Sequence, residues 1–358
     1  MYSDAVAPNP TKQQVERILQ LAKLGSSPEA VDQMLESLRE VTAQWDGQSP
    51  LDPSNQLRLQ SLENELRDYL ITKDPLRKLT PETIDNYLKS PEKTSTATLT
   101  QVIVIVLLSF FNAVSALILP VLGLVPWQNG FLLMVPLFFV TLHIGIAWLY
   151  FSALSNFKQE FKNAFVLICM GILLLSVVFS HYVIIELLGL GNLLLFRYGG
   201  ILALVTASFG LIYFGLRKYA GLLKINNFFT SLKWLGLVSV AVIAAAVLAP
   251  HPGQQSFEPF FDFALASMWL FTMFVGFSAG VARQISKNVT IAYAKSMKWL
   301  YIYLILGFVG SFGGTIGLPL VGELNGGFLY VLIGVMGVIP QLFLLYTGYL
   351  FKKETSLT

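Results

Sequence analysis

The stretch NGFLLMVPLFFVTLHIGIAWLYFSAL, residues 129–154, contains no Asp, Glu, Lys or Arg, and the residues that follow, SNFKQEFK (155–162), contain Lys158 and Lys162. A membrane-spanning helix needs about 20 predominantly apolar residues. Residues 129–154 are therefore long enough to cross a bilayer, and the two lysines mark one end of the crossing.

Similar apolar segments fill the chain on both sides of this stretch. Of the 358 residues, 54% are hydrophobic and 13% are charged, whereas roughly a quarter are charged in an ordinary soluble domain. We therefore predict an all-α, polytopic membrane protein with eight transmembrane helices. The predicted spans are about 98–123, 129–154, 164–188, 197–220, 231–249, 259–282, 294–319 and 327–351.

Basic residues occupy every second connection between these spans. Because Lys and Arg concentrate in cytoplasmic loops, this alternation predicts a multi-pass protein of a bacterial inner membrane or an equivalent membrane, with both termini cytoplasmic. The predicted inner cations are Lys158, Lys162, Arg217, Lys218, Lys224, Lys233, Arg283, Lys287, Lys295, Lys298, Lys352 and Lys353. The predicted outer charges are Arg197, Glu186, Glu258, Asp262 and Glu323.

Residues 1–93 differ from the rest in charge and periodicity, and they predict a soluble cytosolic four-helix head. Residues 1–97 hold eleven Lys/Arg and fifteen Asp/Glu. Prolines at 28, 53 and 81 lie where a first helical turn would begin. For the first helix, Thr11 and Gln14 have the spacing of a capping box. A short polar linker, residues 94–100, leads into the membrane part.

The apolar stripes of this head allow two interpretations. They can satisfy one another in a small self-contained bundle, or part of them, within residues 11–90, can bind a protein partner or the loops of the membrane part. A domain of this size has a marginal core, which favours an additional contact. The head lacks a stripe of Lys and Arg, so we do not expect it to bind nucleic acid.

Three polar residues, Asn112, His143 and Gln341, are predicted to lie near the middle of the bilayer. An unpaired polar group in hydrocarbon costs several kcal/mol, so these side chains need partners. One interpretation is that each forms an interhelical hydrogen bond. The other is that the three line one polar pocket or pathway for a ligand.

Two further groups concern lipid and packing. Arg283, Lys287, Lys295 and Lys298 form a basic inner loop that can contact membrane lipids or the acidic head. Small residues recur four apart in spans six and seven, which predicts close helix crossings and a possible homo-oligomer face. They include Gly276, Gly280, Gly307, Gly310, Gly313, Gly314 and Gly317.

The sequence predicts no catalytic residues, no metal site and no cofactor. The single cysteine, Cys169, lies in an apolar run and cannot form an internal disulfide. We expect a non-enzymatic membrane scaffold, sensor or assembly factor that recruits a protein partner through its head. The alternative is a passive transporter or channel for a small solute with a polar site at the midplane.

Overall fold

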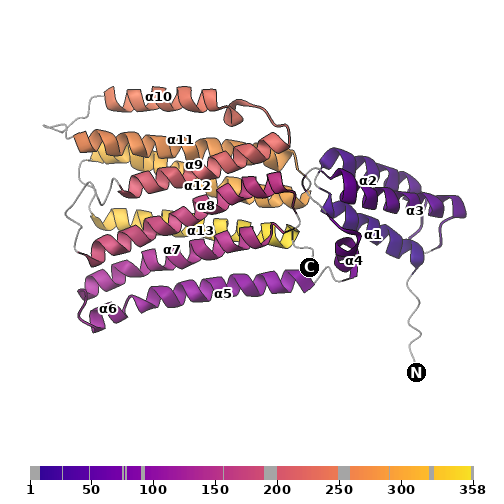
Figure 1. The fold of residues 1–358 in the computed structure, drawn as a ribbon, viewed down its shortest axis with the longest axis horizontal. Coiled ribbons are helices and arrows are strands. Elements are labelled where there is room, and N and C mark those ends of the chain that lie inside the picture. Colours follow the sequence, from indigo (N-terminus) through magenta and orange to yellow (C-terminus); the bar gives the residue numbers. More distant parts are fainter. Residues whose placement is uncertain are drawn as a thin grey trace.

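The computed structural model describes residues 9–355 except 26, 48, 75, 77–78, 90–92, 156, 189–199, 249–258, 290 and 322–325. Within these residues the chain is helical and contains no strand. Figure 1 shows two parts, a bundle of long helices and a group of shorter N-terminal helices at one end of it. The all-helical fold class predicted from the sequence is confirmed for the described residues.

The described residues of the N-terminal part form four α-helices: α1 (Pro10–Leu24), α2 (Pro28–Thr42), α3 (Pro53–Asp68) and α4 (Pro81–Lys89). Each begins on a proline, whose fixed φ suits the first turn and whose missing N–H would have no helical partner there. After α3 the chain continues through one π-helical turn, Tyr69–Lys73. The apolar stripes of these helices meet in a common core that includes Ile18, Leu21, Val31, Leu38, Leu59, Leu66, Leu70 and Ile84.

The predicted capping box at the start of α1 is wrong. The cap is Asn9, whose side chain accepts a hydrogen bond from the backbone N–H of Thr11 at 2.9 Å. Thr11 itself is buried within the first turn. Pro10 moves the helix start one residue earlier than the threonine, because proline at the first helical position leaves the preceding asparagine to cap.

In the second part the described residues form nine α-helices, and the predicted linker residues 94–100 belong to the first turns of the first of them. Among the residues that the structure describes, four stretches are long and apolar enough to cross a membrane: Thr98–Val121, Trp127–Ser152, Gln159–Ile185 and Gly200–Leu222. The helices are α5 (Lys93–Ser115), α6 (Ile118–Val121), α7 (Trp127–Ser152), α8 (Gln159–Leu187), α9 (Gly200–Leu222), α10 (Leu232–Leu248), α11 (Pro259–Lys287), α12 (Ile291–Val321) and α13 (Gly326–Thr355). These apolar helices indicate a membrane-embedded protein.

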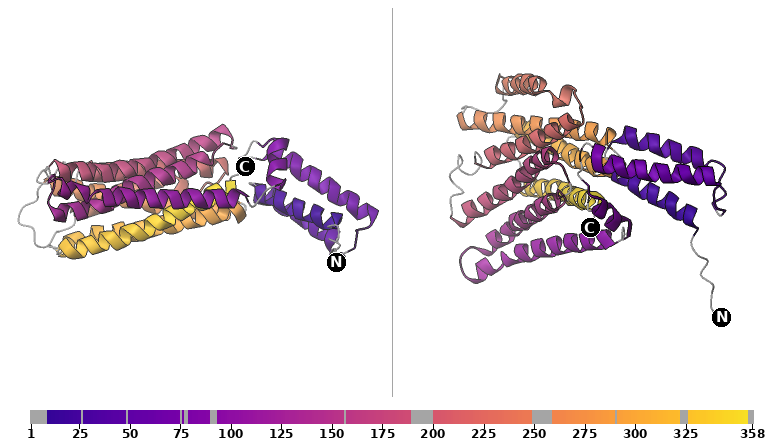
Figure 2. Two further views of the ribbon diagram at one scale, coloured as in Figure 1. Left: turned by 90° about the horizontal axis from the view of Figure 1, so that it is seen from below. Right: turned by 45° about the vertical axis from the view of Figure 1, so that its right-hand side comes forward.

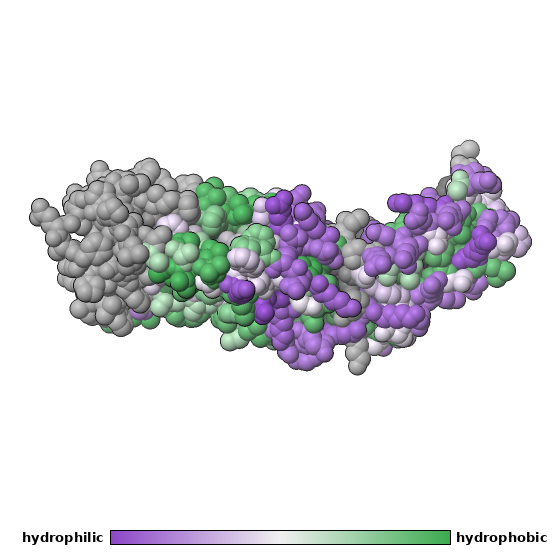
Figure 3. All heavy atoms as spheres, turned by 90° about the horizontal axis from the view of Figure 1, so that it is seen from above, coloured by the Kyte–Doolittle hydropathy of each residue, from purple (hydrophilic) through white to green (hydrophobic). Residues whose placement is uncertain are grey.

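One end of the bundle is set apart by its polarity. The connections after α7, α9 and α11 and the C-terminus all lie at the end next to α1–α4, as Figures 1 and 2 show. On the face shown in Figure 3, hydrophobic side chains cover the adjoining part of the bundle, hydrophilic ones gather at this end, and α1–α4 carry mostly hydrophilic side chains with some hydrophobic ones between them. Three of the predicted outer charges, Arg197, Glu258 and Glu323, lie outside the described residues, and the side chains of Glu186 and Asp262 are not described either.

The backbones of α8 and α9 approach each other closely where the two helices cross. A Cβ atom built on Gly215 would lie 2.7 Å from the carbonyl oxygen of Ala164, and one on Gly171 would lie 2.6 Å from that of Ser208. The Ser208 hydroxyl also donates a hydrogen bond to the carbonyl oxygen of Gly171. Two glycines on opposite helices therefore permit this crossing, as small residues do in membrane bundles.

Two of the glycines predicted to bring spans six and seven together, Gly276 and Gly280, have a different role, whereas the surroundings of Gly313, Gly314 and Gly317 lie outside the described residues. α11 and α12 pack extensively, yet a Cβ on Gly276 would meet the Phe308 ring at 2.9 Å, and one on Gly280 would meet the Phe229 ring at 2.2 Å. These glycines make room for aromatic side chains rather than for a neighbouring backbone. A homo-oligomer through this face stays a prediction.

The N-terminal helices are joined to the bundle at its polar end. The backbone N–H of Lys158 donates to the carbonyl oxygen of Leu76 at 2.9 Å, and the Lys158 ammonium donates to the carbonyl oxygen of Asp74. Leu76 is 1% exposed and belongs to the apolar core of the bundle rather than to that of the N-terminal helices. The segment after α3 is therefore an anchor between the two parts.

Candidate functional site

His143 and Gln341, two of the three predicted midplane residues, are brought together by the packing of α7 against α13. His143 Nε2 lies 2.9 Å from the terminal amide of Gln341, and the histidine is fully buried. The Phe179 ring of α8 stacks on the imidazole with the ring centroids 5.4 Å apart. Gln341 also shares a hydrogen bond with the buried Tyr303 hydroxyl of α12. Four helices thus contribute to one small polar cluster.

The hydrogen-bond partners determine which imidazole nitrogen carries the proton. Nδ1 lies 2.7 Å from the carbonyl oxygen of Phe139, which can only accept, so Nδ1 donates. In a neutral imidazole the other nitrogen, Nε2, can only accept a hydrogen bond. The Gln341 amide must therefore present its NH2 group to Nε2, because the oxygen and nitrogen of an amide are assigned from their hydrogen-bond partners. In that orientation the amide oxygen accepts from Tyr303. Both ring nitrogens are therefore engaged within the protein.

Asn112 lies apart from this pair, although it contacts the same helix. Its side-chain NH2 donates to the carbonyl oxygen of Leu137 at 2.9 Å and to the Thr141 hydroxyl at 2.8 Å. Thr141 and His143 are two residues apart, and residues at that spacing do not face each other on a helix. α7 consequently uses different faces to bond α5 and α13. The structure does not bring the three midplane residues into one site.

The predicted basic inner loop is spread over the polar end of the bundle. Arg283, Lys287, Lys295 and Lys298 are all exposed. The Arg283 guanidinium lies over the Tyr301 ring, 5.9 Å from its centroid, a cation–π distance. The ion pairs found among the described residues all lie in α1–α4, between Arg17 or Arg67 and the carboxylates of Glu63 and Asp85. In the described part of the chain, these inner cations therefore form no ion pair with the N-terminal helices.

A carboxyl group with no motif around it in the sequence, that of Glu354, lies at the C-terminal end of α13. The buried Ser296 hydroxyl of α12 donates a hydrogen bond to Glu354. Burial raises the pKa of this carboxyl to about 7, although the Ser296 hydrogen bond and the nearby Lys295 oppose the shift. Only the packing of α12 against α13 could reveal this site, because residue 354 lies in a short polar tail in the sequence.

The same end of α13 is also attached to α7. The Lys352 ammonium donates to the Ser152 hydroxyl at 2.7 Å and lies over the Trp148 ring, 4.7 Å from its centroid. Lys352 was predicted as an inner cation, but its contacts were not. The C-terminal turn of α13 is therefore held between the C-terminal end of α7 and the N-terminal end of α12.

A cavity of about 360 Å³ lies between α10, α11 and α12, next to the 3-10 turn Phe228–Thr230. Its lining is mostly apolar, and Arg283 and Gln284 lie at one end. The described residues contain no group of three or more His, Cys, Asp or Glu side chains that could hold a metal ion. Comparison of the chain with protein-family models, curated proteins and solved structures found no match.

Proposed function

We propose that this chain is a multi-pass protein of a bacterial inner membrane or an equivalent membrane, with both termini on the cytoplasmic side. Of its eight spans, α5 and α6 together form the first, and each helix from α7 to α13 forms one more. The positive-inside pattern supports this orientation. The position of α1–α4 and the C-terminus beside the connections after α7, α9 and α11 agrees with it. In this arrangement α1–α4 form a cytosolic head.

Within this membrane arrangement, the head acts as a non-catalytic scaffold that recruits a protein partner. The observation that carries the proposal is the anchor formed by Asp74, Leu76 and Lys158. It supplies the additional buried contact that a small head needs, and it holds the head at a fixed position above the membrane. A partner bound to such a head is held at a fixed position too.

The exposed surface of the head suggests where a partner binds. Most of its large apolar side chains are used in its own core. Among the described residues of α1–α4, the large hydrophobic side chains that stay exposed are Leu19, at 42%, and Leu57, at 67%. An exposed apolar side chain surrounded by polar residues is the type of group that a partner can bury at the centre of an interface.

The transport alternative has less support. The midplane pair His143 and Gln341 uses both imidazole nitrogens for bonds within the protein. Asn112 is bonded to a different face of α7. This geometry is that of interhelical hydrogen bonding. Solute flux in proteoliposomes with wild-type protein and His143→Leu protein would test the alternative, and a flux abolished by the substitution would support it.

Affinity purification from membranes tests the scaffold proposal. The full chain is compared with Leu57→Asp protein and with Gln60→Asp protein, which adds the same charge at another exposed position of α3. We expect a stoichiometric partner with wild-type and Gln60→Asp protein and its loss with Leu57→Asp protein. Recovery of the same partner from a chain that lacks residues 1–93 would contradict recruitment by the head.

A further inference from the structure

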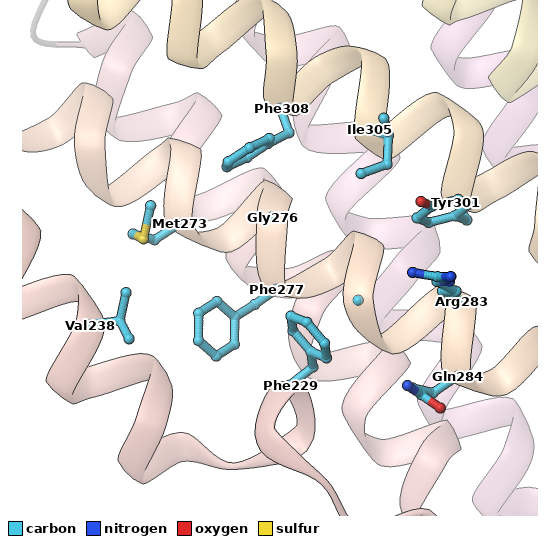
Figure 4. Close-up of a pocket in the computed structure, with 11 residues that line it drawn as sticks. Phe229, Val238, Met273, Gly276, Phe277, Arg283, Gln284, Tyr301, Ile305 and Phe308 are labelled. Carbon is cyan, nitrogen blue, oxygen red and sulfur yellow. The ribbon is translucent and has the colours of Figure 1, made fainter.

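The cavity between α10, α11 and α12 is an elongated groove with ends of different chemistry. Figure 4 shows Arg283, Gln284 and Tyr301 at one end, and Met273, Phe308 and Val238 toward the other. Met273 and Arg283 are ten residues apart on α11, which is about 15 Å along a helix. The groove therefore extends from the polar end of the bundle into its apolar part.

Two glycines of α11 allow aromatic rings to pack against this helix and to form walls of the groove. Gly276 and Gly280 are one turn apart, and they lie directly against the Phe308 and Phe229 rings, respectively. A Cβ at either position would overlap a ring, so side chains there would push these aromatic walls outward. The groove thus has a smooth apolar surface, which suits a flexible hydrocarbon chain better than a polar solute.

The polar end carries a cation whose charge is not neutralised by a carboxylate in the described ion pairs. Arg283 is exposed, and its described contact is with the face of Tyr301. The flat guanidinium can bind two oxygens of one phosphate at the same time. Lys287 is one turn further along α11 and adds positive potential on the cytosolic side.

We propose that this groove is a binding site for one anionic glycerophospholipid of the inner leaflet, with an acyl chain along the apolar walls and its phosphate at Arg283. A phospholipid matches both ends of the groove. Its anionic phosphate would lie at the polar end, and its hydrocarbon chain would lie along the apolar walls beyond it. Net negative charge on the headgroup is favoured, since the choline of a zwitterionic lipid would oppose the Arg283 and Lys287 charges.

This inference rests on the membrane placement proposed above and is independent of whether the head recruits a partner. If the chain is not embedded in a membrane, the protein will not reconstitute into lipid bilayers at all. If only the partner proposal is wrong, lipid selectivity will be unchanged.

Native mass spectrometry of the full-length protein, released from bilayers of equal parts phosphatidylglycerol and phosphatidylcholine, tests the site. Arg283→Gln removes the phosphate contact, and Lys218→Gln removes an exposed inner cation that does not line the groove. We expect wild-type and Lys218→Gln protein to retain one phosphatidylglycerol preferentially. Arg283→Gln protein should retain about fivefold less phosphatidylglycerol than wild-type protein, because it has lost one basic contact.

A second measurement on wild-type protein addresses the acyl chain. Phosphatidylglycerol with a photoreactive acyl chain should label peptides of α11 and α12 that contain Met273 or Phe308, and Val238→Trp, which fills the groove from α10, should abolish this labelling. Equal retention of both lipids by wild-type protein would overturn the proposal. So would labelling that is as strong on the exposed Phe110 and Phe111 of α5.

Discussion

The crossing of α8 and α9 gives a prediction whose magnitude follows from the structure. In Gly215→Ala protein the new methyl group would lie 2.7 Å from the carbonyl oxygen of Ala164 and 2.6 Å from a side-chain carbon of Ile168. Ordinary contact begins at about 3.4 Å, so the two helices would have to separate by about 0.7 Å. Overpacking of this kind costs about 1–3 kcal/mol.

A matched control is available on the same helix. A Cβ at Gly221 would meet nothing within 4 Å. Both substitutions replace glycine with alanine in α9, but Gly221 lies beside the helix end, so its gain in helix propensity is smaller than the gain of up to about 1 kcal/mol at the interior Gly215. The amount by which Gly215→Ala protein is less stable than Gly221→Ala protein is therefore a lower limit of the steric cost at the crossing.

Thermal unfolding of the purified proteins in detergent, followed by helical circular dichroism, measures this difference. We expect Gly215→Ala protein to unfold about 2–12 °C below Gly221→Ala protein, given about 2–4 °C for each kcal/mol, the conversion that holds for chains of about 150–250 residues. Equal midpoints would refute the reasoning, because they would mean that the α8–α9 contact yields to a methyl group without cost.

Three further predictions concern the midplane pair, the C-terminal carboxyl and the anchor. In a double-mutant cycle of His143→Leu and Gln341→Leu, we expect a coupling of about 0.6–2 kcal/mol in thermal unfolding, and additive effects would show that the bond contributes nothing. Burial raises the pKa of Glu354 from 4.5 to about 7, so the folded state binds the proton of this carboxyl more tightly than the unfolded state does. The protonated carboxyl therefore contributes fully to stability below about pH 4.5, and this contribution is lost as the pH rises to about 7. Glu354→Gln should flatten this part of the stability profile by at most about 3 kcal/mol, and an unchanged profile would contradict the assignment. Leu76→Ala should weaken the anchor by about 2–5 kcal/mol, visible as faster limited proteolysis between α3 and α4, whereas an unchanged cleavage rate would argue against the anchor.

Much of the helix order could be predicted from the sequence. Prolines 28, 53 and 81 begin α2, α3 and α4 as expected, because proline suits a first helical turn. The predicted spans fall on helices because long apolar runs form helices in a chain of this composition. The number of true membrane crossings and their orientation stay predictions.

The candidate sites could be predicted only in part. Depth along a span suggested that Asn112, His143 and Gln341 lie at one level, but depth says nothing about which way a helix is turned. The structure pairs His143 with Gln341 and bonds Asn112 to Thr141 on another face of α7. Glycine spacing likewise could not show whether a glycine faces a backbone, as Gly215 does, or an aromatic ring, as Gly280 does.

The sequence by itself determined the helical class, the order of the helices and the polarity of their ends, because these properties depend on hydropathy, capping and charge read along one dimension. The tertiary structure decided the α8–α9 crossing, the anchor at Leu76 and the groove beside Arg283. These features depend on the rotation of each helix about its axis and on the shapes of residues far apart in the chain. Those quantities are set by packing in three dimensions and have no local signal in the sequence.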